Sequence, residues 1–497
     1  MNTRSTSTMI MMLIFWMILG GMLISPPLQA AQPLSDQEIA DAVEDKIQAD
    51  GAVPVSRLQV TTEAGVVTLS GTVPTLLAKE RALRLAESLR GVKSVVNLIQ
   101  VKTINRDDVE IRKDIEKAFL RNPAIKARNL SPDVRNGVVT ISGDVQSWTE
   151  RDLALKMAEA VKGVRDVKDA ISIRFAGQRS DPEILDDVVQ ALKWDALLKH
   201  SRITAKVTDG TVKLTGSVVS AAQKSRAKRV ASVAGVKKVD ASELEVTSPA
   251  GKQPEEPMVT DAQIQQAVVN ALQVDPRTST YKISVDVTGR VATLRGTVET
   301  LEAKRAAKQD AMNTRGIIAV KNRLKVQPTL ELDDASVAKR VREALAADPL
   351  VESYQIGVSV IGNVAYLSGT VDASYQKTEA EFAASTVTGV IDVVNGLAVR
   401  NPAAPSVYDP FVDYFIFYDL SGPASERAKK NEAQLRQDIR DQFYWSPFVD
   451  ADQVKVTVKD GVVTLTGTVD SNYEKEMAAK NAFDGGASVV VNELKVK

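Results

Sequence analysis

One short phrase recurs six times along the chain, and each copy has a glycine where a strand normally has a side chain. The last copy reads DGVVTLTGTV and spans residues 460–469. The six glycines are Gly71, Gly143, Gly216, Gly296, Gly369 and Gly467. A regular period of about seventy residues is typical of repeated small domains. Because 497 residues also exceed what one hydrophobic core supports, the sequence predicts a tandem array.

Two of the intervals between copies are longer than the rest and contain extra chain. Residues 248–257 read SPAGKQPEEP, which is typical of a proline-rich linker, and residues 401–430 form a longer insertion. The predicted modules occupy residues 35–103, 107–174, 181–247, 260–327, 333–400 and 431–497. We number them one to six.

Within each repeat the apolar pattern changes from a helical to a strand period. Apolar residues four apart, such as Ile39, Val43 and Ile47, predict a first helix. Two alternating strands joined by a tight turn, a second helix and a last strand follow. Repeats four and five are predicted to insert one residue between turn and strand, which would change the register of those two hairpins. The prediction is an α+β fold of six α-β-β-α-β modules, each a three-stranded mixed sheet with two helices on one face and a polar, open opposite face.

The glycine of the phrase lies on the core side of its strand. Gly467, for example, falls between Leu465 and Val469 at a period of two. Glycine inside a strand indicates a bulge or a close approach. We expect a helix to cross the sheet there, because a larger residue would cost about 1–3 kcal/mol by overpacking. The alternative is that the glycine opens a ligand pocket.

Two further positions recur. A second glycine follows the second helix, where it predicts a left-handed helix cap. It is Gly91, Gly163, Gly235, Gly316, Gly389 and, shifted, Gly485. A small polar residue in the last strand is expected to bond nearby backbone. It is Asn97, Asp169, Asn322, Asn395 and Asn492.

The N-terminus has the pattern of a secretory signal. Arg4 precedes an apolar run over residues 9–24, and SPPLQAAQ follows. We expect residues 1–30 to be a signal peptide, cleaved after Ala30 or Ala31, with an uncleaved membrane anchor as the alternative.

Composition excludes several classes of function. The net charge is zero, which argues against a nucleic-acid partner. The chain has no cysteine and one histidine, His200, so thiolate chemistry and multi-histidine metal sites are excluded. His200 is expected to be a solvated loop residue. No catalytic constellation is visible, so we expect no enzyme activity, cofactor, metal site or small-molecule substrate.

The GxVxLxG strand and the closing VxNxL strand resemble the BON domain, in six copies that span nearly the whole mature chain. The resemblance implies a periplasmic protein that associates with envelope phospholipids, with a link to osmotic stress, or that contacts other envelope proteins as a scaffold without touching lipid. It implies no catalytic residues, and it assigns the six phrase glycines a structural role. The lipid or partner and the oligomeric state stay open.

Two stretches are candidates for such contacts. The densest basic cluster, in and after the second helix of repeat three, suits anionic headgroups, although a solvated helix face is the alternative. It comprises Lys224, Arg226, Lys228, Arg229, Lys237 and Lys238. The insertion contains an aromatic segment over residues 408–420 that suits an interdomain strap, a membrane interface or a protein partner. Its central aromatics are Tyr414, Phe415, Phe417 and Tyr418.

Overall fold

The computed structural model describes residues 34–497, except 248–258, 401–430 and the short gaps at 51, 126, 176, 199–200, 352, 460–461 and 488. The predicted signal segment, residues 1–30, lies outside this part of the chain. So do His200 and the aromatic residues Tyr414, Phe415, Phe417 and Tyr418. What was predicted for these residues stays a prediction.

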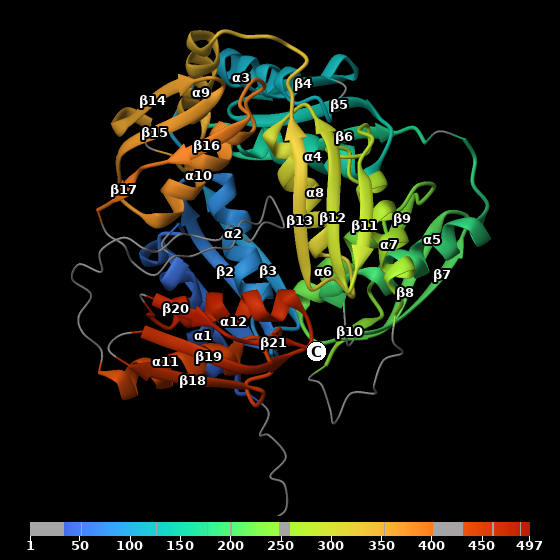
Figure 1. Ribbon diagram of the computed structural model, residues 1–497, viewed down its shortest axis with the longest axis vertical. Helices are drawn as coiled ribbons and strands as arrows, with labels where there is room; N and C mark the ends of the chain where they lie inside the picture. Colours follow the sequence, from blue (N-terminus) through green and yellow to red (C-terminus); the bar gives the residue numbers. More distant parts are fainter. Residues whose placement is uncertain are drawn as a thin grey trace, which may run out of the picture. The chain divides into compact units, whose positions relative to one another are not determined.

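Modules one to three each contain the predicted order of elements (Figure 1). Module one consists of α1 (Asp36–Asp50), η1 (Val55–Arg57), β1 (Leu58–Glu63), β2 (Val66–Val73), α2 (Leu76–Glu87) and β3 (Ser94–Val101). Module two consists of α3 (Asp108–Arg121), η2 (Ala127–Asn129), β4 (Leu130–Arg135), β5 (Val138–Val145), α4 (Trp148–Glu159) and β6 (Asp166–Ile173). Module three consists of α5 (Asp181–Trp194), η3 (Ala196–Leu198), β7 (Arg202–Thr208), β8 (Thr211–Val218), α6 (Ala221–Val230), β9 (Lys238–Asp240) and β10 (Leu244–Val246).

Modules four to six repeat the same order, and the last strand is split into two pieces in modules three, five and six. Module four consists of α7 (Asp261–Val274), β11 (Ser284–Thr288), β12 (Val291–Val298), α8 (Leu301–Met312) and β13 (Ala319–Val326). Module five consists of α9 (Asp334–Ala347), η4 (Ser353–Gln355), β14 (Ile356–Ile361), β15 (Val364–Val371), α10 (Ser374–Ser385), β16 (Asp392–Asn395) and β17 (Ala398–Val399). Module six consists of α11 (Glu432–Trp445), β18 (Val454–Lys459), β19 (Val462–Val469), α12 (Asn472–Asp484), β20 (Val489–Asn492) and β21 (Lys495–Val496).

The second strand lies in the middle of every sheet. In module one β2 pairs antiparallel with β1 and parallel with β3, so that Gly71 lies opposite Leu58 on one side and Ile99 on the other. The other sheets follow the same order, with both pieces of a split last strand pairing with the middle strand. The predicted three-stranded mixed sheet is therefore confirmed.

Two helices pack on one face of each sheet and enclose the core with it. In module one α1 contacts β1 and α2 contacts β3. The predicted stripe residues Ile39, Val43 and Ile47 are at most 3% exposed, and Leu69 of β2 is fully buried beneath them. These contacts confirm the two-helix, one-face arrangement.

The opposite faces of the sheets are not uniformly polar, contrary to expectation. In module one Val96 and Leu98 of β3 are 43% and 59% exposed. In module five Ile361 is 67% exposed, and Tyr366 and Val394 are exposed beside it on the same open face. The fold needs only one apolar face, so the composition of the other face is free to differ between modules.

The glycine of the recurring phrase has a different cause from the one expected. Gly71 has φ +116°, and a Cβ there would lie 2.1 Å from the carbonyl oxygen of Arg57, just before β1. In the other five modules the atom nearest to a Cβ at the phrase glycine is also a backbone carbonyl oxygen, that of the residue equivalent to Arg57. The hypothesis that a crossing helix requires the glycine is wrong. The neighbouring backbone occupies the space, and positive φ adds a second reason for glycine.

The close approach to a helix occurs instead at the second recurring glycine. A Cβ at Gly163 would lie 3.0 Å from Ile111 Cδ1 on the first helix of its module, and a Cβ at Gly316 would lie 2.7 Å from Ile264 Cδ1. Both glycines have φ +95°, which is the predicted left-handed conformation. Each lies three residues beyond the C-cap of its helix, Ala160 or Asn313, so the prediction that the glycine itself caps the helix is wrong. In module six the roles are divided, because Gly485 approaches Ile439 while its neighbour Gly486 has the positive φ.

An aspartate at the first position of the first helix holds the hairpin turn. Asp36 accepts hydrogen bonds from the N–H groups of Ala64 and Gly65, at 2.7 and 2.8 Å. The equivalent pairs are Asp108 with Asn136 and Gly137, Asp181 with Asp209 and Gly210, Asp261 with Gly289 and Arg290, and Asp334 with Gly362 and Asn363. The turn has two residues in each of these modules, so the expected insertion in repeats four and five is wrong. There the glycine stands first in the turn rather than second.

The recurring asparagine of the last strand bonds nearby backbone, as predicted. Asn322 donates to the carbonyl of Lys304 on α8 at 2.7 Å and accepts from the N–H of Leu324 at 3.2 Å. Asn97, Asn395 and Asn492 make the same pair of bonds. This side chain therefore ties the second helix to the last strand.

One backbone contact recurs between modules, which together form a single unit, Asp36–Lys497. The N–H of Arg90 in module one donates to the carbonyl of Trp445 in module six at 3.0 Å. Lys162 of module two donates to Ala347 of module five at 3.1 Å. Arg315 of module four donates to Trp194 of module three at 2.8 Å. Each acceptor is the last residue of a first helix, whose carbonyl has no partner within the helix. Modules one and six, two and five, and three and four are thus joined in the same way.

Among the described helices, none combines the length and the apolar character needed to cross a bilayer.

Candidate functional site

The predicted basic cluster of module three does not form one exposed surface. Lys228, Lys237 and Lys238 are exposed, whereas Lys224 and Arg229 are half-buried. Arg226 is committed to an ion pair, in which its Nη2 lies 2.7 Å from Oδ2 of Asp195 and its side chain is 13% exposed. The structure therefore leaves three exposed lysines for an external anion.

A second basic surface lies on the open sheet face of module four. Its five cationic side chains are all exposed and come from all three strands or their ends. They are Lys282, Arg295, Lys321, Arg323 and Lys325. Asp286 is the one acidic residue of β11, β12 and β13 and lies on the same face. Within the described part of the chain, these five groups have no ion pair or hydrogen bond. We call this set the basic sheet face.

Like charges stand next to one another on the basic sheet face. Arg295 of β12 pairs in register with Arg323 of β13. Like charges opposite each other on paired strands destabilise a sheet by a few tenths of a kcal/mol to about 1 kcal/mol. A surface that costs stability in the free protein is a candidate for binding an anion.

Sequence reasoning missed this surface, although the signal was present. Lys321, Arg323 and Lys325 alternate with apolar or buried positions at a period of two, so a strand prediction places them on one face. Module one carries the uncharged Val96 and Leu98 on the corresponding strand, so the fold does not require the charge.

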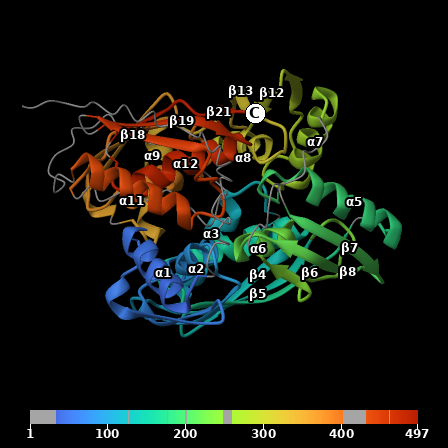
Figure 2. The same ribbon diagram turned by 90° about the horizontal axis from the view of Figure 1, so that it is seen from below.

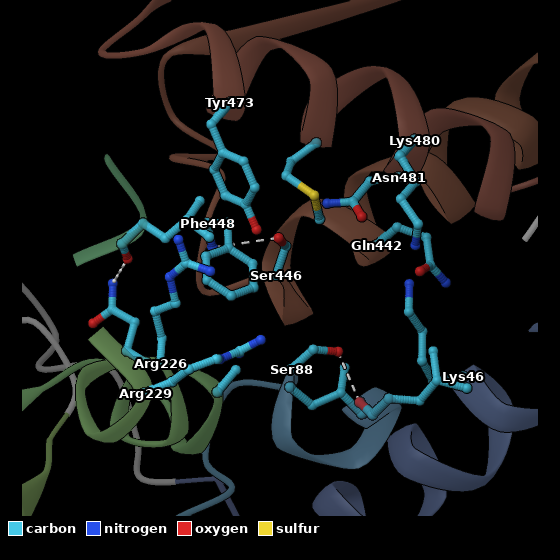
Figure 3. Close-up of a pocket in the computed structure, with 16 residues that line it drawn as sticks. Lys46, Ser88, Arg226, Arg229, Gln442, Ser446, Phe448, Tyr473, Lys480 and Asn481 are labelled. Carbon is cyan, nitrogen blue, oxygen red and sulfur yellow. Dashed lines mark hydrogen bonds between the residues drawn. The ribbon is translucent and has the colours of Figure 1, made fainter. Parts of the chain in front are cut away.

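A cavity lies where modules one, three and six meet (Figure 3). Its volume is about 80 Å³. The lining comes from α1, α2, α6, α11 and α12, from the segments that follow α2 and α11, and from Leu197 of η3. Leu85, Leu89, Phe448 and Met477 supply apolar wall. Lys46, Arg226, Arg229 and Lys480 supply positive charge, and no carboxylate is among the lining residues.

The two lysines of the cavity share one carboxylate behind its wall. Asp484 Oδ2 lies 2.5 Å from Lys46 Nζ and 3.1 Å from Lys480 Nζ. Figure 3 shows the two ammonium groups directed toward each other. Burial by itself raises the pKa of Asp484, but the two lysines outweigh burial and hold that pKa below its ordinary value. Burial lowers the pKa of Lys480.

One polar group of the cavity has no partner. Asn481 of α12 is 2% exposed, and its Nδ2 makes no hydrogen bond to any residue that the structure describes. By contrast, Ser88 donates to the carbonyl of Leu85 at 2.7 Å, and Ser446 accepts from the N–H of Phe448 at 3.4 Å. The Asn481 amide is therefore the donor that a bound acceptor would satisfy.

Among the described residues, no three acidic or histidine side chains lie close enough together to hold a metal ion.

The six modules match one family model along most of the chain. The model, BON domain, matches residues 35–103, 107–174, 180–248, 260–328, 333–401 and 431–497. The chain belongs to the BON family. Its six phrase glycines are thus a repeated feature of one domain type, and the backbone contact described above explains each of them.

Two curated BON relatives match parts of the chain. Osmotically-inducible protein Y of Escherichia coli K12 is 33% identical over 140 residues, which is 27% of this chain and 70% of the relative. The 21 kDa hemolysin of Actinobacillus pleuropneumoniae is 29% identical over 148 residues, which is 28% of this chain and 75% of the relative. Neither name describes an enzyme.

A solved structure, the C-terminal domain of CdsD from the type III secretion system of Chlamydia trachomatis, matches 43% of this BON chain and 100% of its own. The identity is 16% and the TM-score 0.12, which is too low to support a shared arrangement of modules.

Proposed function

We propose that this BON protein is a non-catalytic component of the periplasm that binds anionic phospholipid surfaces, and that the basic sheet face of module four makes the main contact. The observation that carries the proposal is the set of five exposed cationic side chains without ionic partners on one sheet face. A sheet face of this kind can lie flat against a bilayer, where all five charges reach the headgroups together.

The strength of such binding follows from the charge count. Each lysine or arginine near an anionic leaflet contributes about 1 kcal/mol, and the effect decays within a Debye length. Five charges give on the order of 5 kcal/mol, which is reversible and sensitive to salt. The exposed lysines of module three, Lys228, Lys237 and Lys238, would add avidity if both surfaces reach one membrane.

The relatives support a role in the envelope. One is named for osmotic induction, and the other is named as a hemolysin. A role under osmotic stress is the corresponding proposal for this chain.

Flotation of the purified chain with vesicles tests the proposal. We expect flotation with vesicles containing phosphatidylglycerol, little with pure phosphatidylcholine, and loss above about 0.5 M salt because screening shortens the Debye length. The variant K321Q/R323Q/K325Q should weaken binding at least tenfold.

The matched control makes the same charge change on the sheet of module six, K455Q/K459Q/K495Q, at three exposed lysines. It should bind nearly as well as the parent chain. Equal loss in both variants would show that any cation contributes and would overturn the assigned surface. Absence of flotation with any vesicle would overturn lipid binding itself.

A second candidate is a scaffold that contacts envelope proteins without lipid. The apolar open faces of modules one and five, with Leu98 and Ile361 strongly exposed, favour it. The variant L98K/I361K should then lose chemical cross-links to envelope proteins in cells while its flotation stays unchanged. Unchanged cross-links would remove this candidate.

A further inference from the structure

We infer that the cavity between modules one, three and six binds a small oxyanion that carries a single apolar chain. This inference is independent of the proposed membrane contact, because the cavity and the basic sheet face share no residue. Three features of the cavity lead to it: an unsatisfied donor, a positive wall and an apolar wall.

The donor is the side-chain amide of Asn481. A buried polar group without a hydrogen bond costs about 1–3 kcal/mol, so native proteins contain few of them. Figure 3 shows the amide projecting among the lining side chains of the cavity. A carboxylate or phosphate oxygen placed there would accept the hydrogen bond that the protein does not supply.

The charge of the wall selects an anion. Lys46 and Lys480 share the single carboxylate of Asp484, so this trio has one positive charge in excess when both lysines are protonated. Arg226 faces Asp195 on its far side, and Arg229 interacts with Glu87. An oxyanion in the cavity would be the missing counter-ion of the lysine pair. Charge interactions in such an enclosed place are less screened than at the surface.

The apolar wall selects the rest of the ligand. Leu85 and Leu89 of module one and Phe448 and Met477 of module six all line the cavity. Free phosphate or sulfate would leave this surface uncovered, whereas an alkyl chain would bury it at about 25 cal/mol per Å². A volume of about 80 Å³ is only a few times the roughly 30 Å³ that one water molecule takes up in the liquid, so the cavity admits a short chain and excludes the two acyl chains of a phospholipid. The ligand class is therefore a short-chain carboxylate or a monoalkyl phosphate, which share an oxyanion and one chain.

Binding is tested with four probes on the full chain by calorimetry and thermal shift. Propyl phosphate and butanoate each contain the oxyanion and a three-carbon chain, inorganic phosphate lacks the chain, and propanol lacks the charge. We expect saturable binding of at least one of the first two, at least tenfold tighter than of the last two. Whichever of the two binds more tightly identifies the headgroup as phosphate or carboxylate.

The variant N481L removes the donor and keeps a side chain of four heavy atoms branched at Cγ. We expect it to weaken binding of the preferred probe at least tenfold and to raise the melting temperature of the free protein, because an unsatisfied amide is gone. The control N270L makes the same change at an exposed position of α7 and should bind like the parent chain. A purely structural role for Asn481 would leave binding unchanged.

Other outcomes overturn the inference. If propanol binds as tightly as propyl phosphate, the site recognises only apolar chains, and if inorganic phosphate binds as tightly, the chain plays no part. If no probe binds, the cavity is not this site. The variant K321Q/R323Q/K325Q should keep normal probe binding, so failure of the membrane proposal and failure of this one are distinguishable.

Discussion

Modules one and five each have an aspartate at the equivalent position, at the end of the first helix, but its side-chain partner is basic in module one and acidic in module five. Asp50 accepts from the N–H of Ala52, and Asp348 accepts from the N–H of Leu350, each two residues further on. In module one Arg81 forms two bonds to Asp50, at 2.5 and 2.9 Å, and both side chains are almost fully buried. In module five the equivalent residue of the second helix is Glu379, which hydrogen-bonds to Asp348.

The two pairs differ in protonation as a result. Burial raises the pKa of Asp348 to about 7, and the hydrogen bonds that it accepts oppose that shift only in part. Two carboxyl groups in contact cannot both carry charge at low cost, so they share a proton. The local turn therefore requires the aspartate, whereas the residues packed around it decide its charge. In module three the equivalent aspartate, Asp195, forms an ion pair with an arginine, Arg226, as in module one.

Removing the arginine should have the largest effect. The variant R81L leaves the Asp50 carboxylate buried and unpaired, which should destabilise module one by about 3–5 kcal/mol. Urea unfolding combined with amide hydrogen exchange of α1 and α2 measures this. The control R57L, at an exposed arginine, should change stability by less than about 0.5 kcal/mol. A loss below 1 kcal/mol in R81L would contradict a stabilising buried pair.

An acid pair can be created between modules two and four. Asn122 occupies the position of Asp50 in module two and donates to the buried carboxylate of Glu302 at 3.2 Å. Burial raises the pKa of Glu302. The variant N122D would replace the amide donor by a second carboxyl group in contact with this buried one. We expect a loss of about 1–3 kcal/mol at pH 8 and a smaller loss at pH 5, measured by urea unfolding.

The control for this prediction is N122S. Serine already holds the equivalent turn in module six, where Ser446 accepts from the N–H of Phe448. It keeps the turn and adds no charge, so its stability should not depend on pH more than that of the parent chain. Equal pH dependence in N122D and N122S would show that the carboxylates do not interact.

Relieving the existing acid pair should have the smallest effect, in the opposite direction. The folded pKa of Asp348 is about 7 against an ordinary value of 3.8, so the folded state keeps a proton that the unfolded state has lost. This contribution to stability is complete below pH 3.8 and disappears as pH rises through 7.

The variant E379Q should therefore gain about 1–2 kcal/mol at pH 8 and flatten the fall in stability between pH 4 and 7. Thermal unfolding across that pH range measures both. E331Q, at an exposed glutamate, should reproduce the pH profile of the parent chain. An unchanged profile in E379Q would mean that the pair does not titrate as a unit.

The repeat and its elements could be predicted because their signals are local. Apolar residues four apart, as in Ile39, Val43 and Ile47, specify a helix and its buried face without reference to other modules. The role of Asn322 was likewise predictable, because its partners lie in the same module. The two sets of glycines were found for the same reason, but the helix approach that was expected at the phrase glycine occurs at the second glycine instead. Whether backbone or helix approaches Gly71 or Gly163 depends on strand register and helix placement.

The basic sheet face could have been predicted from the sequence, whereas the cavity could not. Lys321, Arg323 and Lys325 alternate visibly along one strand, and any correct strand prediction places them together. Lys46 and Lys480 are more than four hundred residues apart, and they meet around Asp484 only because modules one and six are joined. No period or spacing in the chain indicates that meeting.

By itself, the sequence determined six modules of one type, the order of their elements and the face of each helix that is buried. Tertiary structure alone decided which modules join, which carboxyl groups keep a proton and where Asn481 is left without a partner. The reason is physical. Periodicity records how one segment divides between core and solvent, whereas charge state and hydrogen bonding depend on atoms brought in from distant segments.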